Sequence, residues 1–491
     1  MSKYISILIF LAGLFQETYA QGAGGSVVRN AGKETQTTQQ KTNILFILVD
    51  DWGWTDLSSA GSKYYETPNI DNLAGQGMRF SQAYSVGPNC APSRASLMTG
   101  KYTPRHGIYT VGTSERGETT DRKLIPVENK TVLASSFVTI AEELKNAGYS
   151  TGLIGKWQLG GKNQKADAQS QGFDHVTGGT PGTSSYFYPY NKQGKESPHE
   201  GITSGKEGEY LTDRLTDEAV KFLDSNKEKP FFLYLSYFAV HTPIEAKADI
   251  ISKYKTKKGD ACHNNPTYAA MIQSADEGIG RVLKQLETLN LDKNTLVVFF
   301  SDNGGMGAVT KQYPLRGSKG MLYEGGVRVP LIVKWPGKTK PGSATDTPVI
   351  GIDFYPTFLE IAGIDKPLNE QVDGQSLVPL LTQKQTKQRD IFWHFPAYLE
   401  AYKGDKTNKD AFRTRPTSTI RSGDFKLHEF YEDGRIELYN IRQDIGETKD
   451  ISKSNPAKAK ELKDKLDAWK TETNAPVPSK PNPEFSTASG K

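Results

Sequence analysis

Short continuous runs of apolar residues alternate along this chain with longer segments in which apolar residues recur every three or four positions. The run at residues 42–49 predicts a strand buried on both faces, as in a parallel sheet. Further strands are predicted at residues 151–154, 231–236, 296–301 and 330–334. The helical spacing predicts helices at residues 137–147, 209–225, 266–290 and 353–362. This alternation indicates an α/β fold with a large, mostly parallel sheet flanked by helices.

The pattern changes near residue 385. The sequence Glu432-Asp433-Gly434 is a hairpin turn signal between two predicted strands. These strands cover residues 418–430 and 435–441, and an amphipathic helix is predicted at residues 455–470. We therefore expect a main domain at residues 42–384 and a smaller C-terminal α+β domain, with an antiparallel sheet, at residues 385–491.

The first twenty residues have the pattern of a secretory signal peptide. Lys3 supplies a positive start, residues 5–15 are apolar, and residues 18–20 offer a cleavage site. The apolar run is too short to cross a bilayer, and no later stretch is long and apolar enough. We expect a secreted or periplasmic protein without a membrane span, whose mature chain begins with a flexible lead-in at residues 21–41.

Charge and cysteine content narrow the function classes. The 61 Lys and Arg residues exceed the 56 Asp and Glu residues by only 5, which is too weak a balance to indicate nucleic-acid binding. Only two cysteines occur, Cys90 and Cys262. They either form a disulfide, as an exported protein permits, or have separate roles.

Acidic and amide residues follow two of the predicted strands. Asp50 and Asp51 come directly after the first strand, and Asp302 and Asn303 follow the strand at residues 296–301. Carboxylates at the end of a buried strand are costly unless a cation neutralises them, and this ligand set suits Ca²⁺ or Mg²⁺ better than Zn²⁺. The alternative is that each pair caps a helix or makes a turn.

The segment Cys90-Ala-Pro-Ser-Arg94 precedes residues that can form a helix. A small nucleophile at a helix N-terminus, with an arginine one turn away, suits a tetrahedral oxyanion. Without such neighbours, a lone buried cysteine is usually inert packing.

Cys-x-Pro-Ser-Arg resembles the signature of the formylglycine-dependent type I sulfatases, which belong to the alkaline phosphatase superfamily. Four further segments resemble blocks of that family in the same order. They are Gly155-Lys-Trp-Gln-Leu-Gly160, Ala239-Val-His-Thr-Pro243, Ser301-Asp-Asn-Gly-Gly305 and Gly317-Ser-Lys-Gly320, which continues to Pro330. The resemblance extends from about residue 43 to residue 441, and it implies the alkaline phosphatase-like fold.

The resemblance also implies the roles of the site residues. Cys90 would be oxidised to formylglycine by a formylglycine-generating maturation enzyme. The metal ligands would be Asp50, Asp51, residue 90, Asp302 and Asn303, with Ca²⁺ expected and Mg²⁺ as the alternative. The catalytic residues would be Cys90, Arg94, Lys156, Gln158, His241 and Lys319.

One position departs from the family pattern. The family has histidine two residues after the lysine of the second signature, whereas this chain has Gln158. Glutamine donates and accepts hydrogen bonds but takes no proton at neutral pH. It can orient a hydroxyl group, so the role of a base at this position falls to another group.

The mechanism implied by the family starts from a hydrated formylglycine, one oxygen of which attacks sulfur. Arg94, Lys156 and Lys319 spread the charge, and His241 or Lys319 protonates the departing alcohol. The expected substrate is a sulfated polysaccharide or oligosaccharide. The aromatic segment at residues 186–190 and the segment at residues 257–266 are candidate substrate loops, with core packing as the alternative for the aromatic residues.

Two other functions stay open at this point. A phosphonate or phosphate ester hydrolase of the same superfamily is the rival enzyme, although seven histidines, only one of them in a site motif, supply a two-zinc site poorly. A non-catalytic glycan-binding homologue is the second alternative, and Gln158 is the feature that favours it.

Overall fold

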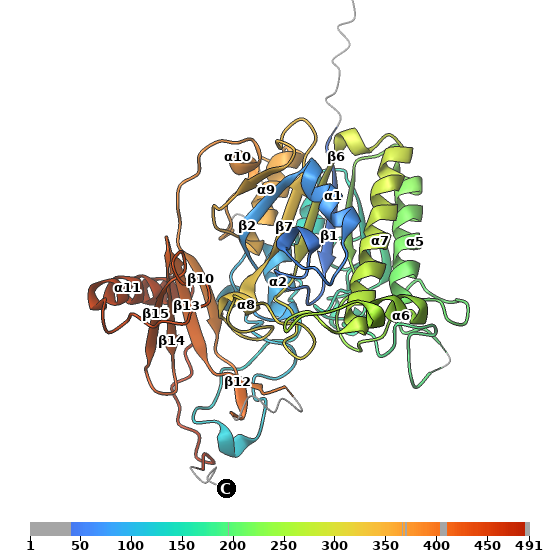
Figure 1. The fold of residues 1–491 in the computed structure, drawn as a ribbon. Helices are drawn as coiled ribbons and strands as arrows, with labels where there is room; N and C mark the ends of the chain where they lie inside the picture. Colours follow the sequence, from blue (N-terminus) through green and yellow to red (C-terminus); the bar gives the residue numbers. More distant parts are fainter. Residues whose placement is uncertain (1–40, 195, 366, 369–370, 403–409, 487–491) are drawn as a thin grey trace, which may run out of the picture. The chain divides into compact units, whose positions relative to one another are not determined.

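A nine-stranded mixed sheet organises the main part of the chain in the computed structural model, which describes residues 41–194, 196–365, 367–368, 371–402 and 410–486 (Figure 1). Its strands follow the order β4-β3-β5-β1-β6-β7-β2-β8, and β9 pairs with β2. They are β1 (Asn43–Val49), β2 (Met78–Tyr84), β3 (Ser150–Gly155), β4 (His175–Gly178), β5 (Phe231–Ser236), β6 (Thr295–Ser301), β7 (Arg328–Lys334), β8 (Ser343–Thr345) and β9 (Val349–Ile350).

The five strands from β4 to β6 in this order are parallel to one another, whereas β7 is antiparallel to both β6 and β2. The mostly parallel α/β sheet is therefore confirmed. The antiparallel direction of β7 is a feature that the apolar run at residues 330–334 did not reveal, because a buried strand has the same pattern in either direction.

Alternation along β1 fills a core on each face of the sheet. Leu45 and Ile47 pack in one cluster and Phe46 and Leu48 in another, and all four are fully buried. The first cluster includes residues of α1 (Pro68–Gln76), α5 (Leu211–Asn226), α6 (Ala248–Thr256) and α7 (Pro266–Thr288). The second includes residues of α2 (Cys90–Thr99), α4 (Ile140–Asn146) and α9 (Phe354–Ala362).

Helix boundaries differ from the prediction most at α4. It begins at Ile140 rather than at residue 137, because Thr139 and Glu142 form a capping box. None of the helices in the described ranges is long and apolar enough to cross a membrane. The predicted signal peptide at residues 1–20 and the lead-in up to residue 40 lie outside the described residues.

A four-stranded antiparallel sheet forms the C-terminal part, as predicted, with the strand order β10-β13-β14-β15. Its strands are β10 (Ile391–Phe395), β13 (Thr417–Ser422), β14 (Phe425–Phe430) and β15 (Ile436–Asn440), and α11 (Pro456–Glu472) packs on β13 and β14. The single strand predicted at residues 418–430 was wrong. It is two strands, because the backbone turns back at Gly423, where φ is +58°.

A buried ionic network joins this sheet to the main part of the chain. Nζ of Lys426 lies 2.8 Å from Oε1 of Glu324, which opens α8 (Glu324–Val327), and both side chains are inaccessible to solvent. Glu447 accepts from Nε2 of His428 at 2.8 Å and from the backbone N–H of Glu324 at 2.6 Å. The start of α8 is therefore held by charges from the C-terminal part.

Candidate active site

Neighbouring parallel strands bring the predicted site residues to one edge of the sheet. Strands β3, β5, β1 and β6 lie side by side, and their carboxyl ends meet at this edge, where ligands of α/β sheets gather. The residues that follow these four strands are Lys156 after β3, His241 after β5, Asp50 and Asp51 after β1, and Asp302 and Asn303 after β6.

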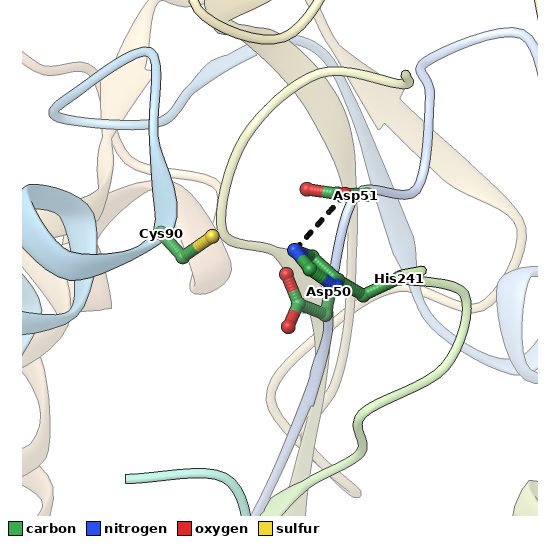
Figure 2. Close-up of side chains that lie close together, drawn as sticks. All are labelled: Asp50, Asp51, Cys90 and His241. Atoms are coloured by element: carbon green, nitrogen blue, oxygen red, sulfur yellow. Dashed lines mark ion pairs between the residues drawn. The ribbon is translucent and has the colours of Figure 1, made fainter. Parts of the chain in front are cut away.

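Four of the predicted residues form a tight cluster. One ligand atom from each of Asp50, Asp51, Cys90 and His241 lies within 4.8 Å of the others. Figure 2 shows the Cys90 sulfur, at the start of α2, pointing toward the Asp50 carboxylate and the His241 ring. Nε2 of His241 lies 3.8 Å from Oδ2 of Asp51. These side chains come from three separate parts of the chain and converge on one point.

Unsatisfied oxygen atoms in this cluster fit a hard cation. Oδ1 of Asp50 and Oδ1 of Asn303 are buried and have no hydrogen-bond partner among the described residues. The Asn303 amide is oriented by its Nδ2, which donates to Oδ1 of Asp51 at 2.8 Å. Buried polar atoms are normally paired, and Ca²⁺ and Mg²⁺ prefer oxygen ligands. Asp50 and Asn303 therefore have free oxygen atoms of the kind that such an ion requires, and the Asp51 carboxylate lies beside them.

Asp302 lies beside this cluster rather than in it. Its Oδ2 accepts from Nε and Nη2 of Arg94 at 3.0 and 2.7 Å, and its Oδ1 accepts from the backbone N–H of Asp51 at 3.3 Å. Nη1 of Arg94 donates to Oγ of Ser236 at 2.5 Å. All three guanidinium nitrogens of Arg94 thus bind protein acceptors, so its contribution is charge and orientation.

Two lysines neutralise the carboxylates of the cluster. Nζ of Lys156 lies 2.5 Å from Oδ2 of Asp50, and Nζ of Lys319 lies 2.8 Å from Oδ2 of Asp51. Burial by itself raises the pKa of Asp50, but the nearby Lys156, together with His241, Arg94 and Lys319, holds that pKa well below its usual range. Each ammonium group has three N–H donors, so both lysines keep donors for a ligand.

The position of Lys156 depends on a close approach of two strands. A Cβ at Gly155, whose φ is +112°, would lie 1.8 Å from the carbonyl oxygen of Ser236. The backbone N–H of Lys156 donates to that same oxygen at 2.7 Å.

Gln158, two residues later, has a φ of +66°, and its Oε1 is buried without a partner among the described residues. A side-chain-bearing residue held in the left-handed backbone region, as Gln158 is, is typical of functional sites.

Cys90 is the first residue of α2, where helix N–H groups favour an anion. Burial, and then the Asp50 charge, raise the pKa of the Cys90 thiol to about 12. Both cysteines are free, so the alternative of a disulfide between Cys90 and Cys262 was wrong. The thiol sits inside the charged cluster and not in an apolar packing environment.

Two tyrosines hold loops of the site: Tyr186, from the aromatic segment predicted as a candidate substrate loop, and Tyr402, which the sequence did not assign to the site. The Tyr186 hydroxyl donates to the carbonyl oxygens of Phe238 and His241, at 2.7 and 2.9 Å. Tyr186 and Tyr190 are fully buried, so core packing is the correct interpretation for these two members of the aromatic segment. The Tyr402 hydroxyl donates to the carbonyl oxygen of Lys319 at 2.8 Å. No local pattern marks Tyr402, which lies far from Lys319 in the sequence.

The comparison with family models decides between the candidate enzymes. Residues 42–364, which include all ten predicted site residues, match the family model described as Sulfatase. The chain belongs to the sulfatase family. Residues 317–472 of this sulfatase also match the model described as N-sulphoglucosamine sulphohydrolase, C-terminal. It is therefore a sulfuric ester hydrolase.

Curated relatives and solved structures agree with this assignment. A "Sulfatase" of Formosa agariphila is 36% identical over 89% of this chain and 90% of its own length. The N-acetylgalactosamine-6-sulfatase of Mus musculus is 33% identical over 72% of this chain and 69% of its own. The crystal structure of Ps i-CgsB in complex with k-i-k-neocarrahexaose matches with a TM-score of 0.73 and 31% identity, over 90% of this chain and 95% of that one.

Proposed function

We propose that this sulfatase is exported and removes sulfate esters from sulfated oligosaccharides or polysaccharides, with a formylglycine made from Cys90 and one divalent cation. The observation that carries the proposal is the convergence of Asp50, Asp51, Cys90 and His241 within 4.8 Å. Relatives named N-acetylgalactosamine-6-sulfatase and the similar structure in complex with k-i-k-neocarrahexaose support a carbohydrate substrate. The signal-peptide pattern of residues 1–20 supports export.

Asp50, Asp51, Asp302, Asn303 and the modified residue 90 would hold the cation, and Asp302 also accepts from the backbone N–H of Asp51. We expect Ca²⁺, with Mg²⁺ as the alternative. When present, the aldehyde and the cation supply an oxygen nucleophile and polarise the sulfate. The aldehyde requires a formylglycine-generating enzyme as a partner during synthesis.

The charges of the site favour an anionic ester. Three carboxylates, Asp50, Asp51 and Asp302, face three cationic side chains, Arg94, Lys156 and Lys319. This balance is neutral, so a bound divalent cation makes the site positive. The lysines, which keep free N–H donors, then bind the sulfuryl oxygens and stabilise the charge that develops during the reaction.

Proton transfer completes the hydrolysis, in which a sulfate ester and water yield an alcohol and sulfate. His241 or Lys319 donates a proton to the departing alcohol oxygen. Burial and the adjacent Lys319 lower the pKa of His241, and Tyr186 holds the loop that carries it. Gln158 orients a hydroxyl of the modified residue 90 through its amide, while the proton goes to another group.

Sulfate release tests this function. The protein would be produced together with a formylglycine-generating enzyme, beside a Cys90→Ser variant, and sulfate would be measured by ion chromatography on a panel of sulfated glycans and one aryl sulfate. We expect release from particular glycans, no release by the variant, and an aldehyde at residue 90 by peptide mass spectrometry. An intact glycan panel with the aldehyde present would contradict the carbohydrate substrate and favour a binding protein, and release of phosphonate esters alone would favour the rival hydrolase.

A further inference from the structure

A hairpin of the C-terminal part packs on the backbone that follows Lys319. It consists of β11 (Leu399–Glu400) and β12 (Phe412–Thr414), which pair in antiparallel fashion. Oγ1 of Thr414 donates to the carbonyl oxygen of Gly320, and the Tyr402 hydroxyl donates to that of Lys319. The hairpin is therefore tied to the active-site lysine through two main-chain contacts.

Arg413 is the middle residue of β12 and points away from the core of the hairpin. Phe412 and Thr414 are buried, whereas Arg413 is half-buried, as the alternation of a strand requires. Its guanidinium carbon lies 4.1 Å from the centre of the Tyr402 ring. This stacking fixes the plane of the guanidinium group.

The guanidinium group also lies directly against the loop of Lys319. A Cβ at Gly320, whose φ is +90°, would come 2.7 Å from Nε of Arg413 and 3.3 Å from Nη2. Glycine at 320 thus makes room for Arg413. The adjacent Lys319 reaches Asp51, so Arg413 lies against the loop that carries an active-site lysine.

Among the described residues, no carboxylate forms a close ion pair with Arg413, although its charge acts on Glu400 and helps to lower the pKa of that carboxyl. The buried Nε of Arg413 has no hydrogen-bond partner in the same part of the chain. Glu400 pairs with Arg116 through Oε1, while its Oε2 has no hydrogen-bond partner in the described ranges, and Glu432 pairs with Arg415. A cavity of about 300 Å³ adjoins this position, and its charged lining residues are Lys123, Arg413, Arg415 and Arg435 together with Asp410, Glu432 and Asp433. A guanidinium group that forms no close ion pair with the described residues and keeps an unpartnered Nε, near a site for sulfate esters, is suited to bind an anion.

We propose that Arg413 binds a second anionic substituent, a sulfate or a carboxylate, on the glycan whose sulfate ester is cleaved. This inference rests on the proposed function and narrows its substrate class to glycans with two neighbouring negative charges. Arg413 is then a specificity residue, held by Tyr402, and the chemistry at residue 90 does not involve it.

The test compares two substrates that share one cleavable sulfate and differ in a second anionic group. One doubly charged substrate carries a second sulfate and another carries a uronate carboxylate, so the comparison shows which of the two anions Arg413 binds. We expect the ratio of kcat/KM for the doubly charged over the singly charged substrate to fall at least tenfold in Arg413→Gln, mainly through KM. Arg413→Lys should recover part of that ratio, and the exposed Arg442→Gln should leave the ratio as in the wild type.

Binding to the inactive Cys90→Ser protein, measured by calorimetry, separates this inference from catalysis. The inference is supported if adding Arg413→Gln to the Cys90→Ser protein weakens binding of the doubly charged ligand and leaves binding of the singly charged ligand unchanged. Equal losses for both ligands, or a wild-type protein without preference for the second charge, would overturn it while the proposed function stands. A wild-type protein that neither binds nor cleaves any sulfated sugar would overturn both.

Discussion

Nζ of Lys156 lies 2.5 Å from Oδ2 of Asp50, and neither side chain is more than 1% exposed. This contact joins the second signature segment to the first strand. We expect Lys156→Met to lower kcat by about 10²- to 10³-fold, because a buried donor that stabilises developing charge is lost. Sulfate release would be measured together with circular dichroism. Lys162→Met, which removes an exposed lysine two residues after this segment, is the control, and a Lys156→Met variant within threefold of wild-type activity would refute the role.

Removal of the metal should reduce both activity and stability. A ligand at 100 times its Kd stabilises a folded protein by about 2.7 kcal/mol, so a chelator should lower Tm and added Ca²⁺ should restore it. Asn303→Ala removes a buried oxygen that has no partner among the described residues, and it should weaken Ca²⁺ binding measured by calorimetry. The exposed Asn264→Ala is the control. Unchanged Ca²⁺ affinity in Asn303→Ala would exclude it as a ligand.

Gln158 should matter through its amide group. Because its Oε1 is buried without a partner in the described ranges and its backbone φ is +66°, we expect Gln158→Ala to lower kcat by about tenfold or more. Gln158→His should retain activity and add a new ionisation to the pH profile of kcat. Full activity of the alanine variant across the pH range would mean that this position only shapes the loop.

The buried His106 should make the fold sensitive to acid. Its Nε2 lies 2.9 Å from Oγ of Ser96 on α2, and burial lowers the pKa of His106 to about 3. Between pH 6.5 and 3 the unfolded chain therefore binds the additional proton, so stability is present above pH 6.5 and is lost as the pH falls. The expected contribution of His106 to the slope is about 1.4 kcal/mol per pH unit. Urea unfolding at pH 7, 6 and 5 should give a shallower slope for His106→Gln and an unchanged slope for the exposed His175→Gln.

The ion pair between Lys426 and Glu324 should be important for stability. Lys426→Met leaves the fully buried Glu324 without its nearest cation, which we expect to cost about 3–5 kcal/mol in the free energy of unfolding. Lys465→Met, on the half-exposed face of α11, should change it by less than about 1 kcal/mol. Adding Glu324→Gln to Lys426→Met should recover part of the loss. A double variant as unstable as the sum of both singles would show that the two charges act independently.

The sequence by itself determined the α/β class, the helices and strands around the site, and the family. Buried strands and amphipathic helices have local hydrophobic patterns, and the polar residues after β1 and β6 identify a ligand edge wherever these strands lie side by side. The ordered segments from Cys90 to Lys319 identified the sulfatase family because the chemistry needs those side chains.

Only the tertiary structure decided which of these side chains share contacts. Arg94 uses its donors on Asp302 and Ser236, 208 and 142 residues away, so its role could not be read from its position near Cys90. The contact of Tyr402 with Lys319 spans 83 residues, and Arg413 reaches the same loop through a hairpin without a strong pattern. Such contacts depend on how separate elements pack, and packing between distant segments has no periodic signal in the sequence.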